Sequence, residues 1–380
     1  MNLETKVFLK KKFHEYYRNS RIKAPREIEK REFGIGTLES KIKIRHKSFK
    51  SEEELNLYLR REAPFYISYS SAYYEFPENQ PIENKQWLGS ELIFDLDTEL
   101  EFLEREKLEK VKLETINLID FLVEDFGFSK KDIEVNFSGS KGFHIHVDNE
   151  KVRSLDKEER REIIDYITGE GIDIECFMVQ ERVKGHRLNG KKVMVRKGPD
   201  ENSTGWGKRI YKMMEAFLLA DVKEKKAIIG KSHIPTKKIQ EIHEKREDYL
   251  NMIKRGSWDG LPLTQKMKER LVENYAITLG KDTDRMVTLD ITRLIRLPDS
   301  LHGGTGLKAS RLKIKKLDNF DPLRDAVVFG DDEIKIEVKT NLDKFEFFDN
   351  KFHLKKGLLK LPEYVAIFLM LKDKAEIKDH

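Results

Sequence analysis

The sequence has almost no cysteine and no long apolar run. Cys176 is the only cysteine among 380 residues, which excludes an internal disulfide and a zinc site built from several cysteines. The longest apolar run, Val365–Leu371, is far too short to span a bilayer. The N-terminal stretch MNLETKVFLKKKF has no apolar core of a secretory signal. We therefore expect a soluble, cytoplasmic protein that makes no use of a membrane.

The net charge is also small for a chain of this size, at +5, although charged residues make up 37% of the sequence. Positive charge is concentrated in residues 281–316, where nine lysines and arginines accompany four aspartates. Such a stretch is a candidate surface for phosphate groups, and an ordinary solvated face explains the charge equally well.

The length and the apolar content indicate a folded protein with more than one part. Hydrophobic residues make up 38% of the chain, including 22 phenylalanines and 12 tyrosines, which is enough for a buried core. A chain of 380 residues is long for a single domain. We expect two domains, or one domain with a large insertion.

Periodicity along the chain predicts a mixed α+β fold, in which a β-sheet platform is flanked by helices. Residues 345–357 and 333–341 are hairpin candidates. Helices are predicted over residues 3–20, 99–126 and 361–373, and a further helix begins after a cap at Ser51. Strands are predicted over residues 31–49, 65–76, 91–97 and 133–147. Residues 284–316 are predicted to form short strands and turns.

Residues 208–280 differ from the rest because they are highly charged and their apolar residues follow helical spacing. We interpret them as a mainly helical insertion. The mixed domain is then formed by residues 1–207 and 281–380.

Asp95 and Asp97 form the first candidate site. Side chains at i and i+2 of a strand point to the same face, so the two carboxylates project together and repel each other unless a cation or protons lie between them. Mg²⁺ or Mn²⁺, bound by oxygen ligands beside substrate phosphates, satisfies this requirement. The alternative is a strand end with two solvated acids, since such a pair is common in proteins.

Residues 138–147 (SGSKGFHIHV) form the second candidate site. The glycine-flanked turn lets backbone N–H groups approach a phosphate, and Lys141 adds a point charge. His144 and His146 alternate with apolar residues and so share one face of a strand. A plain turn followed by an exposed strand is one alternative, and a zinc site on the two histidines is another; phosphate contact fits the segment better than zinc.

Residues 284–310 form the third and densest candidate site. Asp284 offers a third carboxylate, Arg296 and His302 flank a proline, and the HGGTG loop can surround an anion with backbone donors. Asp290 and arginines beside it offer the alternative of ordinary surface ion pairs. An apolar strand that runs into a loop of glycine, threonine and histidine favours a ligand site.

The three candidate sites fit one reaction. Carboxylates and two divalent ions hold the attacking 3′ oxygen and the leaving group in phosphoryl transfer. Cationic side chains and backbone donors hold a triphosphate and offset the charge that develops on it. We therefore predict a nucleotidyl transfer site, and a two-metal phosphodiesterase stays open as an alternative.

Several segments, taken in order, resemble the catalytic small subunits of archaeal and eukaryotic DNA primases. The resemblance covers most of the chain and predicts their fold. It is carried by residues 31–49 (REFGIGTLESKIKIRHKSF), 70–77 (SSAYYEFP), 91–97 (ELIFDLD), 138–147 (SGSKGFHIHV), 205–206 (GW) and 294–307 (LIRLPDSLHGGTGL).

The resemblance implies a role for each matching residue. It makes Asp95, Asp97 and Asp284 the catalytic metal ligands, with Asp290 as the alternative third acid. The two-metal site would hold Mg²⁺ or Mn²⁺. The residues that it implies for binding of the nucleotide are Ser138, Lys141, His144, Arg296 and His302, with Glu32 and Arg45 near the incoming nucleotide.

The implied activity is that of a DNA-directed nucleotidyltransferase, which joins NTPs or dNTPs into short primers on single-stranded DNA during replication. The implied partners are a large primase subunit that carries an iron–sulfur cluster, the template, and a replicative polymerase or helicase. The implied location is the cytoplasm of an archaeon, at the nucleoid during replication. A repair-type primase–polymerase of the same fold and a non-catalytic subunit that binds single strands are alternatives.

This chain lacks an element that many relatives carry. They have a Cys/His zinc knuckle between the motifs that correspond to residues 91–97 and 138–147, whereas residues 98–137 contain neither cysteine nor histidine here. We therefore expect no structural zinc. Because the proposed chemistry does not use the knuckle, we expect its loss to affect stability or template handling instead of abolishing activity.

Overall fold

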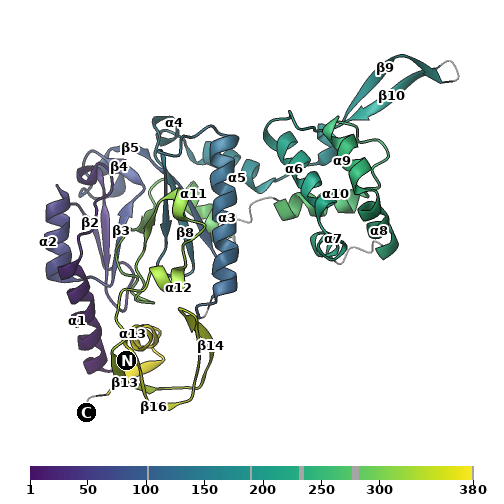
Figure 1. The fold of residues 1–380 in the computed structure, drawn as a ribbon. Helices are drawn as coiled ribbons and strands as arrows, with labels where there is room; N and C mark the ends of the chain where they lie inside the picture. Colours follow the sequence, from purple (N-terminus) through teal and green to yellow (C-terminus); the bar gives the residue numbers. More distant parts are fainter. Residues whose placement is uncertain (101, 189–190, 231–234, 276–281, 379–380) are drawn as a thin grey trace. The chain divides into compact units, whose positions relative to one another are not determined.

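The computed structural model describes residues 1–100, 102–188, 191–230, 235–275 and 282–378 (Figure 1). Its contacts divide the chain into two compact units. The first consists of Met1–Ile119, Phe128–Ile164 and Leu279–His380, and the second of Asp120–Gly127 and Asp165–Thr278. The second unit thus holds residues 208–278 of the expected insertion, together with 120–127 and 165–207, which we had expected in the mixed domain.

The first unit contains an antiparallel four-stranded sheet whose central strands are almost fully buried. Residues on β3 pair with β11 on one side and with β1 on the other, so that Ser68 lies opposite both Arg296 and Gly34. The strands, in sheet order, are β11 (Leu294–Arg296), β3 (Tyr66–Ser70), β1 (Phe33–Gly36) and β2 (Ile44–Lys47).

A second antiparallel sheet of four strands carries the two aspartates predicted as a pair. Its order is β12 (Arg311–Leu312), β7 (Ile133–Phe137), β8 (Gly142–Val147) and β6 (Leu92–Asp97). Alternation on β8 sends Phe143, Ile145 and Val147 into an aromatic and aliphatic core, where Phe143 meets the rings of Phe137 and Phe320. The histidines of β8 therefore lie on the other face of this sheet.

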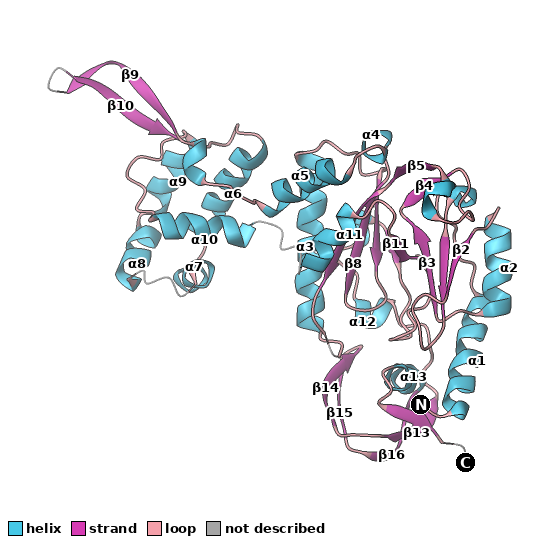
Figure 2. Ribbon diagram, turned by 180° about the vertical axis from the view of Figure 1, so that it is seen from behind, coloured by secondary structure: helices cyan, strands magenta, loops and turns pink. Residues whose placement is uncertain are grey.

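Helices cover the outer faces of the two sheets. In both views α1 (Leu3–Asn19) and α2 (Glu52–Glu62) lie beside the first sheet, and α3 (Arg105–Glu124) lies beside the second (Figures 1 and 2). The inner stripe of α1 is spaced at i and i+4, with Leu9, Phe13 and Tyr17 buried. The mixed α+β fold and the helix positions agree with the sequence-based expectation, although α3 is shorter than predicted.

The C-terminal part adds a small sheet and a helix. The central strand of the sheet, β13 (Glu333–Val338), pairs with β16 (Gly357–Pro362) and β17 (Ala375–Ile377). The segment predicted as a hairpin over 345–357 forms most of the pair β14 (Leu342–Phe347) and β15 (Asn350–Leu354). The apolar helix α13 (Glu363–Leu371) is buried from end to end except at Leu371, so it belongs to the core.

One prediction about local structure is wrong. Short strands and turns were expected from residue 284 onward, but the chain forms a helix, α11 (Asp282–Leu289), before it enters β11. Val287, Thr288 and Leu289 are buried and α11 packs on β6. This tertiary packing overrides the weak helix propensity of valine and threonine. The remaining elements of the first unit are β4 (Ala72–Tyr74), β5 (Trp87–Ser90), α4 (Glu150–Arg153), α12 (Pro322–Asp325) and most of α5 (Lys157–Thr168).

The second unit is mainly helical, with a hairpin that the sequence analysis did not predict. The ion pair between Arg209 and Asp125, 2.7 Å long and buried on both sides, joins two of its segments. Its elements are β9 (Val179–Leu188), β10 (Lys191–Lys197), α6 (Gly205–Leu219), α7 (Val222–Ile229), α8 (Thr236–Glu244), α9 (Arg246–Lys254) and α10 (Gln265–Tyr275). Among the described residues of either unit, no helix is long and apolar enough to cross a bilayer.

The cap of α2 offers a direct test of the fold. The Ser51 hydroxyl accepts a hydrogen bond from the backbone N–H of Glu54, as predicted from the sequence. We expect Ser51→Ala to lower the free energy of unfolding by about 1 kcal/mol, because the helix loses a partner for one of its terminal N–H groups. Urea unfolding of the full chain measures this change. Ser51→Asp keeps an acceptor at the same place and should retain the wild-type midpoint; equal midpoints for all three proteins would contradict the assignment.

Candidate active site

A cavity of about 760 Å³ lies in the first unit, and most of the predicted site residues line it. We call it the aspartate cavity. Its walls come from both four-stranded sheets, from the loops that follow β7 and β11, and from the end of α13. The predicted residues that line it are Arg45, Asp95, Asp97, Ser138, Lys141, His144, Asp290, Arg296 and His302.

Asp95 and Asp97 point into this cavity because they alternate with buried apolar residues on β6. The Asp95 Oδ1 lies 3.5 Å from Nε2 of His144, the residue opposite it on β8. The Asp97 Oδ2 lies 3.0 Å from the Lys141 ammonium. The other oxygen of Asp97, Oδ1, is buried and accepts no hydrogen bond from the described residues. A buried carboxylate oxygen of this kind is costly unless a ligand supplies its partner.

The third acid that lines the aspartate cavity is Asp290. It directly follows α11, where its Oδ1 accepts hydrogen bonds from the backbone N–H and the hydroxyl of Thr292. Asp284, which the resemblance placed first, lies near the start of α11, and its side chain is outside the described residues. The structure thus brings Asp290, the alternative acid, into the same cavity as the two aspartates of β6, and the prediction for Asp284 stays a prediction.

Arg296 is a half-buried cation without an ion-pair partner in the described part of the chain. Its Nη1 is buried without a hydrogen-bond partner, and its guanidinium lies 5.1 Å from the centre of the Tyr66 ring. Burial lowers the pKa of Arg296, because water no longer stabilises the charge. An unpaired guanidinium that lines a cavity is suited to bind an anion there.

His302 is held as a neutral hydrogen-bond donor. The backbone N–H of Gly304 donates to its Nδ1 over 3.2 Å, so the ring proton belongs on Nε2. Burial, followed by the charge of Arg296, lowers the pKa of His302 well below its usual value. The imidazole thus offers an Nε2–H group to the cavity without adding charge.

The loops after β7 and β11 pack on each other at the edge of the cavity. Ser138 organises the first loop, because its hydroxyl oxygen accepts a hydrogen bond from the N–H of Gly142 over 3.2 Å. Thr305 joins the second loop to the first by donating to the carbonyl of Gly139 over 2.5 Å. Gly139 has φ of +79°, and a Cβ there would lie 2.8 Å from Cβ of His302. The first loop therefore needs a glycine at position 139 to approach the second so closely.

Glu32 and Arg45 form a supporting pair in which only Arg45 lines the cavity. Glu32 is fully buried, and its Oε1 lies 3.1 Å from Nε of Arg45 and accepts a 3.3 Å hydrogen bond from the N–H of His46. The buried ammonium of Lys85 lies 3.5 Å from the other oxygen of Glu32. Glu32 thus lies behind the wall, where it holds Arg45 in place.

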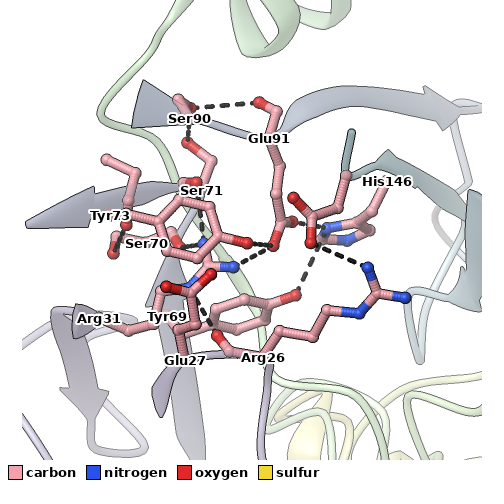
Figure 3. Close-up of polar contacts among 12 residues, drawn as sticks. Arg26, Glu27, Arg31, Tyr69, Ser70, Ser71, Tyr73, Ser90, Glu91 and His146 are labelled. Atoms are coloured by element: carbon pink, nitrogen blue, oxygen red, sulfur yellow. Dashed lines mark hydrogen bonds and ion pairs between the residues drawn. The ribbon is translucent and has the colours of Figure 1, made fainter. Parts of the chain in front are cut away.

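The two histidines of β8 belong to different surroundings. Both are buried, so the alternative of an exposed strand is wrong. Burial lowers the pKa of His144 to about 3, and the charge of Arg296 acts in the same direction. His146 instead lies 2.8 Å from Glu91, which also contacts the buried Arg31 (Figure 3). The two histidines therefore face different partners, His144 toward Asp95 and His146 toward Glu91.

Lys41, Arg293 and Lys372 also line the cavity but were not predicted as site residues. Arg293 precedes Arg296 by three residues and had been read as a surface ion-pair partner. Lys41 lies in a turn before β2, and Lys372 directly follows α13 near the end of the chain. Nothing in the local sequence around Lys372 signals a ligand, because only the tertiary fold brings it to the aspartates.

The residues of the cavity fit a hard divalent cation that is shared with a ligand. Asp97 offers an oxygen without a hydrogen-bond partner, and Asp95 and Asp290 line the same space. Mg²⁺ is usually held by one or two carboxylates together with waters and substrate phosphates, not by a complete protein cage. This preference agrees with the absence of a grouped set of metal ligands among the described side chains.

Comparison with known proteins identifies the family. The family model described as the DNA primase small subunit matches residues 94–314, which is more than half of the chain. The chain belongs to the DNA primase small-subunit family. The match begins at β6 and ends after β12, so it includes both motif loops and all three acids of the aspartate cavity.

Curated primase subunits resemble the chain along its whole length. The DNA primase small subunit PriS of Methanococcoides burtonii is 38% identical, with 99% of each chain covered. The PriS of Methanothrix thermoacetophila is 37% identical over 99% of this chain and 100% of its own. The PriS of Halobacterium salinarum is 32% identical, with 99% of each chain covered. The similarity therefore includes Glu32, Arg45 and Lys372, which lie outside the family match.

Gly142 provides a test of the primase site's geometry. A Cβ at this position would overlap the carbonyl oxygen of Leu96 and Oδ1 of Asp97 on the paired strand. We expect Gly142→Ala to separate β6 from β8, to lower the free energy of unfolding by about 1–3 kcal/mol, and to reduce any activity that depends on Asp97. Thermal unfolding and a nucleotide incorporation assay measure the two effects.

Gly330→Ala is the matched control for this change. A Cβ at Gly330 would meet only the end of the Glu363 side chain, at 3.8 Å. This variant should unfold at the wild-type temperature and keep wild-type incorporation. A Gly142→Ala protein that behaved in the same way would show that the strands tolerate a side chain between them.

Proposed function

We propose that the protein is the catalytic subunit of a DNA primase, which transfers nucleotides from NTPs or dNTPs to a growing 3′ end on a single-stranded DNA template. One observation carries the proposal: Asp95 and Asp97 line the same cavity as Arg296, a half-buried guanidinium whose Nη1 has no hydrogen-bond partner and which has no ion-pair partner in the described chain. Neighbouring carboxylates bind divalent cations, and an unpaired buried guanidinium binds an anion. A metal-bound triphosphate has both charges.

The three acids would hold Mg²⁺ or Mn²⁺, with Asp95 and Asp97 as ligands on β6 and Asp290 as the ligand after α11. When bound, these ions would offset negative charge on the reacting phosphate and its neighbours. Asp97 is suited to this role by its buried Oδ1, and Lys141, at 3.0 Å from Oδ2, holds the orientation of the carboxylate. Asp290 takes the place that Asp284 has in the expectation from the resemblance.

The triphosphate would lie against the cations and backbone donors at the other walls. Arg296 offers the fixed charge of a guanidinium, and His302 offers its Nε2–H. Arg45 is held by Glu32 beside the same space, and Lys41 and Lys372 add charge at the rim. Because these groups are fixed by buried contacts, little reorganisation is needed when charge develops during transfer.

This set of residues favours synthesis over hydrolysis. A two-metal phosphodiesterase needs the acids but has no use for a triphosphate site made by Arg296 and His302. The relatives named as primase small subunits favour primer synthesis over repair synthesis on the same fold. Their name also supports a larger partner subunit, and we propose a heterodimer that acts on single-stranded DNA in the cytoplasm.

Replacement of the acids tests the metal assignment. We expect Asp95→Ala, Asp97→Ala and Asp290→Ala each to reduce incorporation of labelled nucleotide by about 100-fold or more, because each removes a charge that holds the ions beside the phosphates. The assay is primer synthesis on a poly-pyrimidine template with Mg²⁺ or Mn²⁺, after circular dichroism confirms folding. Asp284→Ala, made in parallel, should keep most activity.

Asp332→Ala is the control for general loss of negative charge, because this exposed residue lies outside the aspartate cavity. It should incorporate nucleotide at the wild-type rate. Near-wild-type incorporation by Asp95→Ala or Asp97→Ala would refute the catalytic assignment. Loss of activity in Asp284→Ala with retention in Asp290→Ala would return the third position to Asp284.

A second test addresses the triphosphate contact. We expect His302→Ala to raise the apparent KM for nucleotide by about tenfold, because a hydrogen bond to a charged phosphate is lost. Binding of the template, measured by fluorescence anisotropy with a labelled oligonucleotide, should change less than twofold. The exposed His353 supplies the control, since His353→Ala removes an imidazole far from the cavity lining. Equal losses of nucleotide and template binding would assign His302 to the template instead.

A further inference from the structure

A second cavity, of about 540 Å³, lies in the first unit and is lined by a different set of residues. We call it the lysine-rimmed cavity. It is bounded by the loop after α1, by the start of β7, by the end of β8 and by the segment after β12. Its lining includes none of the residues of the aspartate cavity.

Five lysines from three separate segments form the rim. They are exposed, and within the described part of the chain none of them takes part in an ion pair. Unpaired cations that converge from separate segments raise the local positive potential and attract anions. The five are Lys23, Lys130, Lys131, Lys313 and Lys315.

The back wall contains a buried acceptor. Although burial alone would raise the pKa of Glu91, the charge of Arg31 and the hydrogen bond from His146 lower it to about 2. The carboxylate of Glu91 therefore only accepts hydrogen bonds, so Nδ1 of His146, 2.8 Å away, must carry the ring proton (Figure 3). His146 is 3% exposed, and its Nε2 has no hydrogen-bond partner. In the neutral ring this nitrogen is an acceptor without a donor.

The other polar groups of the back wall are already engaged. Tyr69 is stacked on His146, with ring planes 8° apart, and its hydroxyl lies 3.4 Å from Nδ1. Arg311 is paired with Glu134, and Arg26 with Asp148 at 3.1 Å. The wall is therefore rigid, and Nε2 of His146 is the acceptor that it leaves without a donor.

The shape and the remaining walls suit a ligand of the size of one nucleotide. Cavities that bind small molecules have volumes of about 300–1,000 Å³ and are mostly apolar. Here Pro25, Leu312 and Ile314 supply apolar walls between the lysine rim and His146. A ligand that fills this space must carry negative charge at one end, an apolar body, and a hydrogen-bond donor for Nε2. Inorganic phosphate lacks the apolar body.

We propose that the lysine-rimmed cavity is a second nucleotide-binding site, in which the phosphates face the lysines and a hydroxyl or amino group of the nucleoside donates to Nε2 of His146. The ligand is either a free nucleoside triphosphate or a nucleotide unit within a strand. The proposal concerns binding alone, so it does not rest on the catalytic role of the aspartate cavity.

The lysine-rimmed cavity and the aspartate cavity are both lined by residues of β8. His144 lines the aspartate cavity and His146 lines the lysine-rimmed cavity, although they are two residues apart on the same face of β8. Asp95 on β6 lines the aspartate cavity, and Glu91, which directly precedes β6, lines the lysine-rimmed cavity. Two residues of a strand span about 6.6 Å, so His144 and His146 place the two cavities on neighbouring stretches of one strand.

Binding experiments in EDTA test the proposal. The protein is the full chain carrying Asp95→Asn and Asp97→Asn, which with the chelator removes metal-assisted binding in the aspartate cavity. Labelled ATP in equilibrium dialysis is one arm, and a labelled eight-residue oligodeoxynucleotide in fluorescence anisotropy is the other. The rim variant replaces three lysines of the cavity rim (Lys131→Ala/Lys313→Ala/Lys315→Ala). The control variant removes the same charge at exposed positions outside both cavities (Lys355→Ala/Lys356→Ala/Lys360→Ala).

We expect the rim variant to raise the Kd for ATP by about tenfold or more, because three charge-assisted contacts are lost, while the control variant changes it less than twofold. A selective effect in the oligonucleotide arm alone would instead identify a nucleotide within a strand as the ligand. Equal effects of the rim and control variants in both arms would overturn the proposal.

His146→Asn separates nucleotide binding from general attraction of anions. The asparagine amide can still donate to Glu91, but Nε2 is lost. We expect a rise of at least threefold in the Kd of the ligand identified above, with an unchanged unfolding midpoint. If this variant unfolds, Ile314→Trp replaces it, since the larger ring fills the cavity and should abolish binding. Weaker binding in the rim variant with no effect of His146→Asn, or of Ile314→Trp in its place, would overturn the nucleotide assignment.

Discussion

The pairing of β6 with β8 is the constraint on which the rest of the site depends. In this register Asp95 lies opposite His144 and Asp97 lies opposite Gly142. The absence of a side chain at Gly142 leaves room for the Asp97 carboxylate against the paired strand. A shift by one residue would turn both aspartates into the apolar core. The buried Phe143 and Ile145 on the opposite face of β8 make such a shift costly, and so the core fixes the register that the chemistry needs.

Two charged groups in the aspartate cavity lack the ion-pair or hydrogen-bond partners that such groups normally have in a folded protein. Nη1 of Arg296 is buried and the guanidinium has no ion-pair partner in the described chain, and Oδ1 of Asp97 is buried without a hydrogen-bond donor. The removal of such charges from water costs several kcal/mol, to order of magnitude, when nothing compensates them. They do not compensate each other by direct contact. A metal-bound triphosphate would offset both at once, because it presents a cation to the carboxylate and phosphate oxygens to the guanidinium.

The buried network around Glu91 shows the opposite arrangement. Arg31, Glu91 and His146 are matched in charge and hydrogen bonding, and Tyr73 lies against the Arg31 guanidinium at 3.5 Å from its ring centre (Figure 3). This network links the segment around β3, through Arg31 and Ser70, to β8, through Glu91 and His146. Apart from Nε2 of His146, this cluster is satisfied, and it supports the aspartate cavity, since a strained site persists only where the surrounding structure determines it.

Much of the site could be predicted from the sequence where the signal is local. Alternation on one strand was enough to pair Asp95 with Asp97, and the glycines with Ser138 marked the first motif loop. The contributions of Lys41 and Lys372 could not be predicted, because each follows from a distant segment packing against the sheets. The entry of Asp290 into the cavity depended on α11, whose helical form comes from burial against β6 and not from propensity. The burial of Glu32 could not be predicted either, because its partners Arg45 and Lys85 come from other segments.

The same alternation that predicted the paired aspartates also explains why the sheet can support two cavities. Along β8 every second side chain faces the first sheet, so a polar residue at 144 is followed by another at 146. The buried Ile93, the partner of His146 on β6, lines neither cavity, and no residue lines both. Ligands in the two cavities would therefore be held by separate charges while they share one rigid strand.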